Sequence, residues 1–242
     1  MTESENNTVI DRCKHSRTLA REIEQLMPTV GPCCRRHDLA ACTIDLALEH
    51  HRALVALVEA RDVGAAAALI RPLLEASTSA FWFVYAASDQ QVLALSINPS
   101  EETPEHDIPT LKPMLDALKS YFPAISSLAE ALASKGSRTA LWLHKYTHGG
   151  TPQLIHRDRV SGWREKEVLL ALLRADMFTV LGASVATVRA NKEDFRRYIF
   201  GQRDALAAEL TRRFGVTIPH GQPQIHPIPD KHCCGEPLFA AK

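Results

Sequence analysis

Apolar residues recur every three or four positions along most of the chain, which is the period of amphipathic helices. Alternating β-branched runs and Asn-Gly or Asp-Gly hairpin turns, the usual signals of strands, are missing from the sequence. The pattern predicts an all-α fold, a helical bundle of roughly six to nine helices with an extended, Pro-rich C-terminal tail. We expect a single all-helical domain over residues 1–215 and the tail over residues 216–242.

Proline and glycine positions set the expected ends of the helices. The expected helices are 11–27, 37–61, 63–87, 111–121, 123–133, 138–147, 165–190 (the longest) and 192–214, with a turn or two over 90–96. Pro72 lacks a backbone N–H, so a kink or restart is expected within 63–87. Residues 98–109 and 151–163 are predicted as irregular loops, the second one basic, and Gly215 ends the last helix.

The second expected helix shows how core positions are assigned. Its apolar face is predicted from Leu39, Leu46, Ala53, Leu54 and Leu57. We also expect Cys42 to be a small core residue. Since His50 and His51 are adjacent, at least one should lie near the apolar face as a hydrogen-bonded core histidine.

Charge and targeting signals narrow the class of protein. The 242 residues include 28 Lys+Arg and 28 Asp+Glu, so zero formal net charge gives no global attraction to nucleic acid or membranes. The most apolar stretches, 69–87 and 168–188, carry charges near their centres and predict buried helices rather than membrane spans. With no signal-peptide pattern and only six cysteines, we expect a cytoplasmic protein without membrane or DNA partners.

The helix over 63–87 has two distinct faces. One is aliphatic, whereas the other carries Arg71 and Glu75 at one end and Trp82 and Tyr85 at the other. Because a solvent-facing side rarely presents such aromatic residues beside an ion pair, we expect both faces to be covered and Arg71 and Glu75 to point into a pocket or interface. The alternative is a partly exposed i,i+4 ion pair that stabilises the helix by about 0.2–0.5 kcal/mol.

A second cluster of chemical interest follows at residues 138–150. His144 and His148 are four residues apart and share a helix face, a spacing that can bind zinc. The zincin pattern needs Glu after the first His, where Lys145 stands, so we predict neither a metal nor a cofactor. Gly149 and Gly150 end the helix and let a ligand approach. His148 is therefore a candidate general acid or base, or alternatively a cap of the last carbonyls.

Arg138 and His144 form an Arg-x5-His pattern that resembles the Arg-x4-6-His motif of the HEPN superfamily. This all-α superfamily includes ribonucleases of toxin–antitoxin and antiphage systems. The resemblance implies Arg138 and His144 as a catalytic pair and a homodimer as the assembly. Six residues rotate a helix by about 600°, which leaves the two side chains about 120° apart. They therefore meet only if the helix ends early or across a dimer interface.

Two further stretches, Arg71-Pro-Leu-Leu-Glu75 and Tyr146-Thr-His-Gly-Gly150, resemble a group of uncharacterised bacterial all-helical proteins. These proteins carry an Arg-Pro-Leu-x-Glu helix and a later Thr-His-Gly-Gly helix end, and the resemblance runs to about residue 210. It implies no activity, but it suggests Arg71, Glu75 and His148 as one site. Glu75 would orient His148, Arg71 would hold an anion such as a phosphate, and Tyr146 and Trp82 complete the candidate binding residues.

Cysteine pairs and the remaining motifs leave three functions open. Neither Cys33-Cys34 nor Cys233-Cys234 has the two-residue gap typical of zinc ligands, so their role stays open.

Three functions remain open. The first is a metal-independent ribonuclease, which would bind RNA along Arg157, Arg159 and Arg164. A non-enzymatic module would bind an anion, a nucleotide or a protein partner through Arg71, Glu75 and His148. A structural dimer would use the same cluster as a buried tie. Phosphate-binding loops, hydrolase elbows and dinucleotide fingerprints are absent from the sequence.

Overall fold

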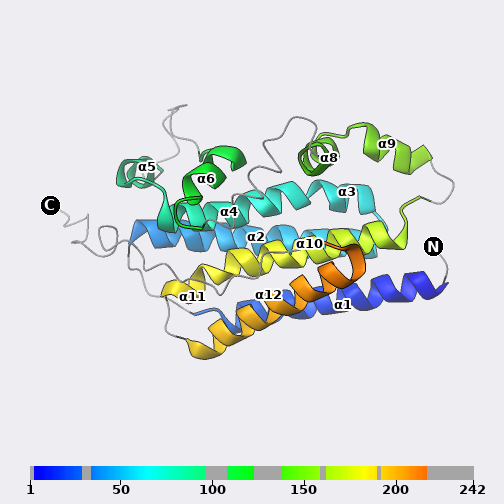
Figure 1. Cartoon of the computed structure of the whole chain (residues 1–242), viewed down its shortest axis with the longest axis horizontal. Coiled ribbons are helices and arrows are strands. Elements are labelled where there is room, and N and C mark those ends of the chain that lie inside the picture. Colours follow the sequence, from blue (N-terminus) through cyan, green and yellow to red (C-terminus); the bar gives the residue numbers. More distant parts are fainter. Residues whose placement is uncertain are drawn as a thin grey trace.

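The computed structural model describes residues 3–28, 34–95, 108–122, 138–158, 162–189 and 192–216. Within these ranges all regular structure is helical, which confirms the predicted fold class. Five long helices run side by side along the longest axis of the molecule (Figure 1): α1 (Glu3–Leu26), α2 (Arg35–Glu59), α4 (Ile70–Tyr85), α10 (Glu165–Ser184) and α12 (Glu193–Phe214). The shorter helices are α3 (Val63–Ala68), α5 (Asp89–Ala94), α6 (Leu111–Leu118), α8 (Arg138–Thr147), α9 (Thr151–Asp158) and α11 (Ala186–Arg189).

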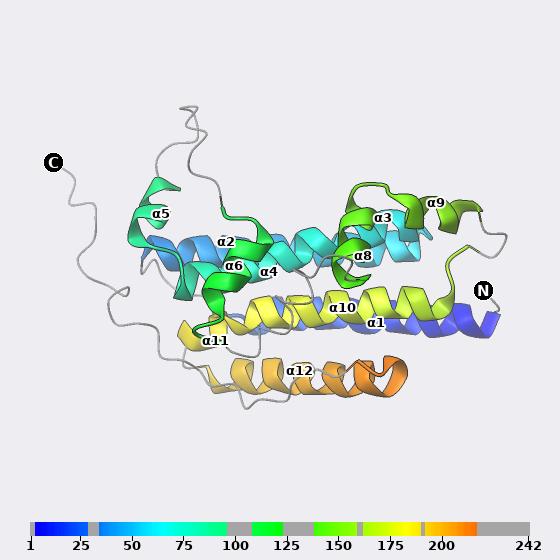
Figure 2. The same cartoon turned by 45° about the horizontal axis from the view of Figure 1, so that its top comes forward.

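The central helix of the bundle is α10, which packs against α1, α2, α4 and α12 (Figure 2). Being covered on several sides, it buries aliphatic residues around most of its circumference, among them Leu172, Leu173 and Val180. It also approaches α4 closely at Gly182, where an added Cβ would lie 2.9 Å from the Ser77 hydroxyl oxygen. The centre of α10 is therefore enclosed by its neighbours, with Leu172, Leu173, Ala175 and Asp176 all 0% exposed. None of the described helices is long and apolar enough to cross a membrane.

The restart predicted at Pro72 is confirmed. Helix α3 ends at Ala68, and α4 begins at Ile70, so Pro72 falls in the first turn of the new helix. The first turn has no intrahelical partner for its N–H groups, and proline is tolerated there for that reason. The aromatic end of α4 is covered on both faces, as predicted, because Phe83 and Tyr85 are 0% and 2% exposed. At the start of the helix Arg71 and Glu75 stay partly exposed as an i,i+4 ion pair, which is the alternative that the sequence left open.

The predicted apolar face of α2 is wrong in part. Leu46 is 43% exposed, and Ala53 and Cys42 are also exposed. The buried stripe is instead formed by Ala40, Thr43, Ile44, Ala47, Leu48, His51, Leu54, Val55 and Val58. Small and polar residues occupy several of these positions, so a prediction based on large apolar residues misplaces the buried face of α2. Cys42 is two residues from Ile44, about 200° around the helix, and therefore faces outward.

Two other predicted elements need correction. Residues 151–158 form α9 rather than an irregular loop, because Pro152 suits the first turn of a helix as well as it ends the previous one. Helix α10 has 20 residues and ends at Ser184, so α2, with 25 residues, is longer. The end at Gly215 is confirmed by its left-handed φ of 65°. The predicted helix at 123–133 and the tail beyond residue 216 lie outside the described residues.

Candidate functional site

The C-terminal end of α8 positions the two histidines singled out in the sequence. The helix runs without interruption to Thr147, and the N–H of His148 still donates to the His144 carbonyl at 3.0 Å. Gly149 then adopts a left-handed φ of 66°, a conformation that favours glycine. The predicted stop is thus confirmed, and it leaves His148 one turn beyond His144 on the same side of the chain.

Arg71, Glu75, His144 and His148, here called the surface cluster, come together where the start of α4 meets the end of α8. Arg71 Nε donates to Glu75 Oε1 at 2.9 Å, and Arg71 Nη1 lies 3.3 Å from His144 Nδ1. The rings of His144 and His148 are 4.6 Å apart between centroids. Because a guanidinium can only donate, Nδ1 of His144 accepts, and its ring proton sits on Nε2.

The surface cluster is open to solvent. The side chains of Arg71 and Glu75 are 28% and 34% exposed, and both histidines are exposed. The predicted pairing of Glu75 with His148 is therefore corrected: the Glu75 carboxylate bonds Arg71, and Arg71 in turn contacts His144. A cation held by a carboxylate beside two imidazoles can bind an oxyanion and exchange protons with it.

Tyr146 and Trp82 are not brought to the surface cluster. Tyr146 is 3% exposed, and its hydroxyl lies 2.9 Å from Nε2 of His156, whose ring stacks on Trp163 at 3.9 Å. It is two residues from His144, about 200° around α8, and so ties α8 to α9. Trp82 is 3% exposed in the core, eleven residues or about 16 Å along α4 from Arg71.

The Arg-x5-His pattern lies on one continuous helix. Since α8 spans residues 138–147, the helix does not end between Arg138 and His144, and of the two ways for them to meet only a dimer interface is left. The side chain of Arg138 lies outside the described part of the chain. Among the described residues, Arg71 from α4 contacts His144.

A second polar cluster, absent from the sequence-based candidates, lies at the centre of the bundle. Arg12, Ser16, His51 and Asp176 form this buried network, with the 0% exposed Asp176 carboxylate of α10 as its hub. Its Oδ1 lies 2.7 Å from His51 Nε2, and its Oδ2 accepts from Ser16 Oγ at 3.0 Å and pairs with Arg12. Arg12 also donates to Glu209 of α12 at 3.1 Å. The network thus joins α1, α2, α10 and α12.

Burial determines the charges in the network. Burial, and after it the nearby Arg12 charge, together lower the pKa of His51 to about 4. His51 is therefore neutral near pH 7 and donates its Nε2 proton to Asp176, which leaves Nδ1 as a lone-pair acceptor. Nδ1 is buried without a hydrogen-bond partner among the described residues. Burial also lowers the pKa of Arg12.

The buried network contains Ser, His and Asp, but its connections differ from those of a nucleophilic triad. Ser16 donates to Asp176 rather than to His51, so no imidazole is placed to take the serine proton. The arrangement instead neutralises a buried carboxylate. The sequence held one signal for it, because a charged residue in the middle of one of the two most apolar stretches needs a partner.

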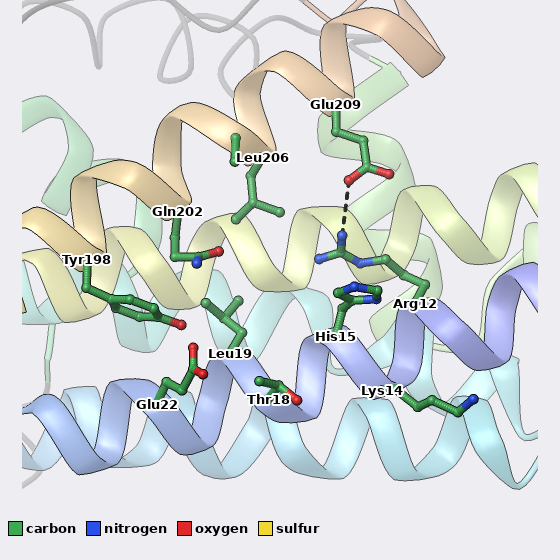
Figure 3. A pocket seen from close by; sticks show the side chains of 11 residues that line it. Arg12, Lys14, His15, Thr18, Leu19, Glu22, Tyr198, Gln202, Leu206 and Glu209 are labelled. Atoms are coloured by element: carbon green, nitrogen blue, oxygen red, sulfur yellow. Dashed lines mark hydrogen bonds and ion pairs between the residues drawn. The ribbon is translucent and has the colours of Figure 1, made fainter.

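Two grooves of about 540 Å³ flank α1. The groove between α1 and α12 has Arg12 and Glu209 at one end and Tyr198 and Glu22 at the other (Figure 3). Burial, followed by the Glu22 carboxylate, raises the pKa of Tyr198. The groove between α1 and α2 includes His51 among its lining residues. The described residues contain no group of three or more His, Cys, Asp or Glu side chains that could hold a metal ion.

Fold and sites together define an all-helical bundle protein with a buried Arg–Asp–His network and a solvent-exposed Arg–Glu–His cluster. The chain belongs to DUF6988, a family of unknown function whose model matches residues 44–210. This range includes the whole surface cluster and, of the buried network, His51 and Asp176. No curated protein and no solved structure matches the chain.

Proposed function

We propose that this chain is a cytoplasmic, metal-independent ribonuclease of a toxin or antiphage defence type, with the surface cluster as its active site. The observation that carries the proposal is the placement of His144 between the Arg71 guanidinium and the His148 ring, at 3.3 Å and 4.6 Å. One cation for a phosphate and two imidazoles for proton transfer are the groups that RNA cleavage without metal needs.

In the proposed reaction, Arg71 binds the non-bridging oxygens of a phosphodiester. His148 accepts the proton of the ribose 2′-hydroxyl as that oxygen attacks phosphorus. When the phosphate binds the Arg71 guanidinium, His144 Nδ1 is released and takes up a proton. The P–O5′ bond then breaks, and the His144 imidazolium delivers its Nε2 proton to the leaving 5′ oxygen, so the products are a 2′,3′-cyclic phosphate and a 5′-hydroxyl. Glu75 keeps Arg71 in place through the 2.9 Å hydrogen bond and contacts no reacting atom.

The HEPN resemblance adds a role for a second copy of the chain. In a homodimer, Arg138 of one protomer would approach His144 of the other, because α8 separates the two residues on one chain. Arg157 and Arg164, both exposed, would follow the RNA backbone. Arg159, the third arginine of that set, lies outside the described residues.

A second candidate is an anion- or nucleotide-binding module without catalysis. It is favoured by one observation, the occupation of the His144 Nδ1 lone pair by Arg71. A side chain already engaged this way can recognise a phosphate oxygen through its Nε2 proton, yet it has no free lone pair to act as a base.

The test is cleavage of mixed RNA substrates in EDTA by the wild type and by His144→Ala, His148→Ala, Arg71→Gln and Arg138→Ala. Arg197→Gln is the matched control, since Arg197 is an exposed arginine 3.9 Å from Asp194 on α12. We expect all four variants to lose cleavage, whereas the Arg197→Gln control should cleave like the wild type. Phosphate-dependent binding without cleavage supports the second candidate, and cleavage by both histidine variants contradicts the first.

A further inference from the structure

The groove between α1 and α12 has a carboxylate at one end, an apolar middle and an ion pair at the other end (Figure 3). Its volume of about 540 Å³ lies within the range of small-molecule sites. Glu22 and Arg12 mark the two ends on α1, and they are about 15 Å apart along the helix. Leu19 of α1 and Leu206 of α12 lie between them. The groove therefore suits an elongated ligand with an apolar body.

The charges at the Arg12 end compensate one another. Arg12 pairs with the carboxylates of Asp176 and Glu209. Glu209 also pairs with Arg213 at 2.8 Å. Lys14, the other cation that lines the groove, bonds to a carboxylate on its own helix at 2.9 Å. A charged ligand therefore gains little at this end, because each group there already has a partner of opposite sign.

Glu22 at the opposite end is a lining carboxylate without a cation. It is half-buried, and it makes no ion pair with any residue that the structure describes. Its neighbour across the groove is Tyr198 of α12, and burial, followed by this carboxylate, raises the pKa of the Tyr198 hydroxyl. A neutral phenol does not compensate the charge of a carboxylate. The Glu22 carboxylate and the Gln202 amide both point into the groove (Figure 3), so a ligand that enters there meets both.

A metal ion does not fit this end of the groove. Ca²⁺ and Mg²⁺ need several oxygen ligands, and the described residues contain no group of three or more His, Cys, Asp or Glu side chains that could hold one. An organic cation has different requirements, because its charge needs one carboxylate and its body needs apolar surface. Glu22 supplies the first, and Leu19 and Leu206 supply the second.

We propose that the α1/α12 groove binds a small organic ammonium ion with an apolar body, such as a primary aralkylamine. The ammonium group donates to the Glu22 carboxylate and to the side-chain oxygen of Gln202, and the apolar body covers Leu19 and Leu206. The site shares no residue with the surface cluster, and it does not depend on the proposed ribonuclease activity.

Phenethylamine and 2-phenylethanol form a matched pair of probes for this site. They have the same aromatic body and nearly the same length, but at neutral pH only the amine is charged. We expect calorimetric titration of the full chain to show the alcohol binding about tenfold more weakly than the amine, the effect of one charge-assisted hydrogen bond. Equal binding of the two probes, or no binding of the amine at millimolar concentration, overturns the proposal.

Substitution of the carboxylate locates the ammonium group. Glu22→Gln removes the charge and keeps the shape, so it should weaken amine binding about tenfold and leave alcohol binding unchanged. Glu24→Gln is the matched control, because Glu24 is two residues further along α1 and pairs with Arg52 of α2. The control should bind the amine like the wild type. Wild-type affinity in Glu22→Gln, or equal losses in the two variants, contradicts the proposed contact.

A second variant locates the apolar body. Ala205 is exposed and lines the groove from α12, so Ala205→Phe should fill the groove without disturbing the core. We expect it to weaken amine binding at least tenfold. Ala208→Phe is the control, since Ala208 is also exposed on α12 but does not line the groove. Urea denaturation of each variant shows that the fold is intact. Unchanged amine binding by a folded Ala205→Phe variant places the amine elsewhere, and the groove proposal then fails.

Discussion

The surface cluster and the buried network use the same residue types in two environments. Each pairs an arginine with a carboxylate and a histidine, namely Arg71, Glu75 and His144 in one and Arg12, Asp176 and His51 in the other. In the network the carboxylate and the histidine are 0% exposed, whereas in the cluster Glu75 is 34% exposed and His144 is exposed. Burial, rather than composition, determines what the two groups can do.

The consequence is a division between stability and chemistry. Desolvation keeps His51 neutral and makes each partner of Asp176 necessary, because an unpaired charge at the centre of α10 has no water to solvate it. The surface cluster has water on one side, so its groups can separate and bind a ligand at little cost to the fold. Each prediction below contrasts the enclosed interior with exposed positions.

The largest effect is expected from the hub of the buried network. Asp176→Asn keeps the volume but removes the charge that neutralises Arg12, and should lower the free energy of unfolding by about 3–5 kcal/mol. Urea denaturation with the exposed Glu75→Gln as a control measures the contrast, with a change below about 1 kcal/mol expected for the control. Similar losses in the two variants would show that burial does not separate the regions.

The second effect is a loss of stability in acid through His51. Its pKa is about 4 in the folded chain, against about 6.5 when unfolded. Above pH 6.5 the His51 ring is neutral in both the folded and the unfolded chain, so its full contribution to stability is present. As the pH falls toward 4, the unfolded state binds the proton first, so about 3 kcal/mol of stability is lost. The free energy of unfolding of the wild type minus that of His51→Gln, measured at each pH, isolates this contribution. A difference that does not change with pH contradicts it.

The third effect concerns the packing of α10 against α4. Gly182→Ala places a Cβ 2.9 Å from the Ser77 hydroxyl oxygen and 3.2 Å from its Cα, so α4 and α10 must move apart. We expect a loss of about 1–3 kcal/mol. Gly201→Ala on α12 is the matched control, because nothing lies within 4 Å of its added Cβ. There alanine should stabilise the helix by about 0.5–1 kcal/mol. Thermal denaturation of both variants shows whether their effects have opposite signs.

The sequence predicts those parts of the fold that depend on local signals. The ends of α8 and α12 follow from glycines that must adopt positive φ, and the break before α4 follows from Pro72. The surface cluster was partly predictable because both of its segments form short motifs on helix ends. Arg71 and Glu75 are four residues apart, as are His144 and His148, so helix geometry alone pairs them.

The buried network was not predictable in the same way. Its contacts join residues 125 to 164 positions apart, and helix periodicity carries no information about which helices become neighbours. At least one of His50 and His51 was expected as a hydrogen-bonded core histidine, and the structure confirms this for His51. Its partner on α10 depends on the packing of the bundle. The errors on α2 have a related cause, since Ala40 and Thr43 are buried by tertiary packing rather than by their own hydrophobicity.

The smallest effect on stability is expected at the surface cluster, and it gives the sharpest separation of the two regions. Arg71→Gln removes a pair whose side chains are 28% and 34% exposed, so the free energy of unfolding should change by less than about 1 kcal/mol. The same substitution removes the cation beside His144, and binding of a short RNA should weaken at least tenfold. Fluorescence anisotropy and urea denaturation on one preparation measure both. A large loss of stability with unchanged RNA binding would make the surface cluster a structural tie like the buried network.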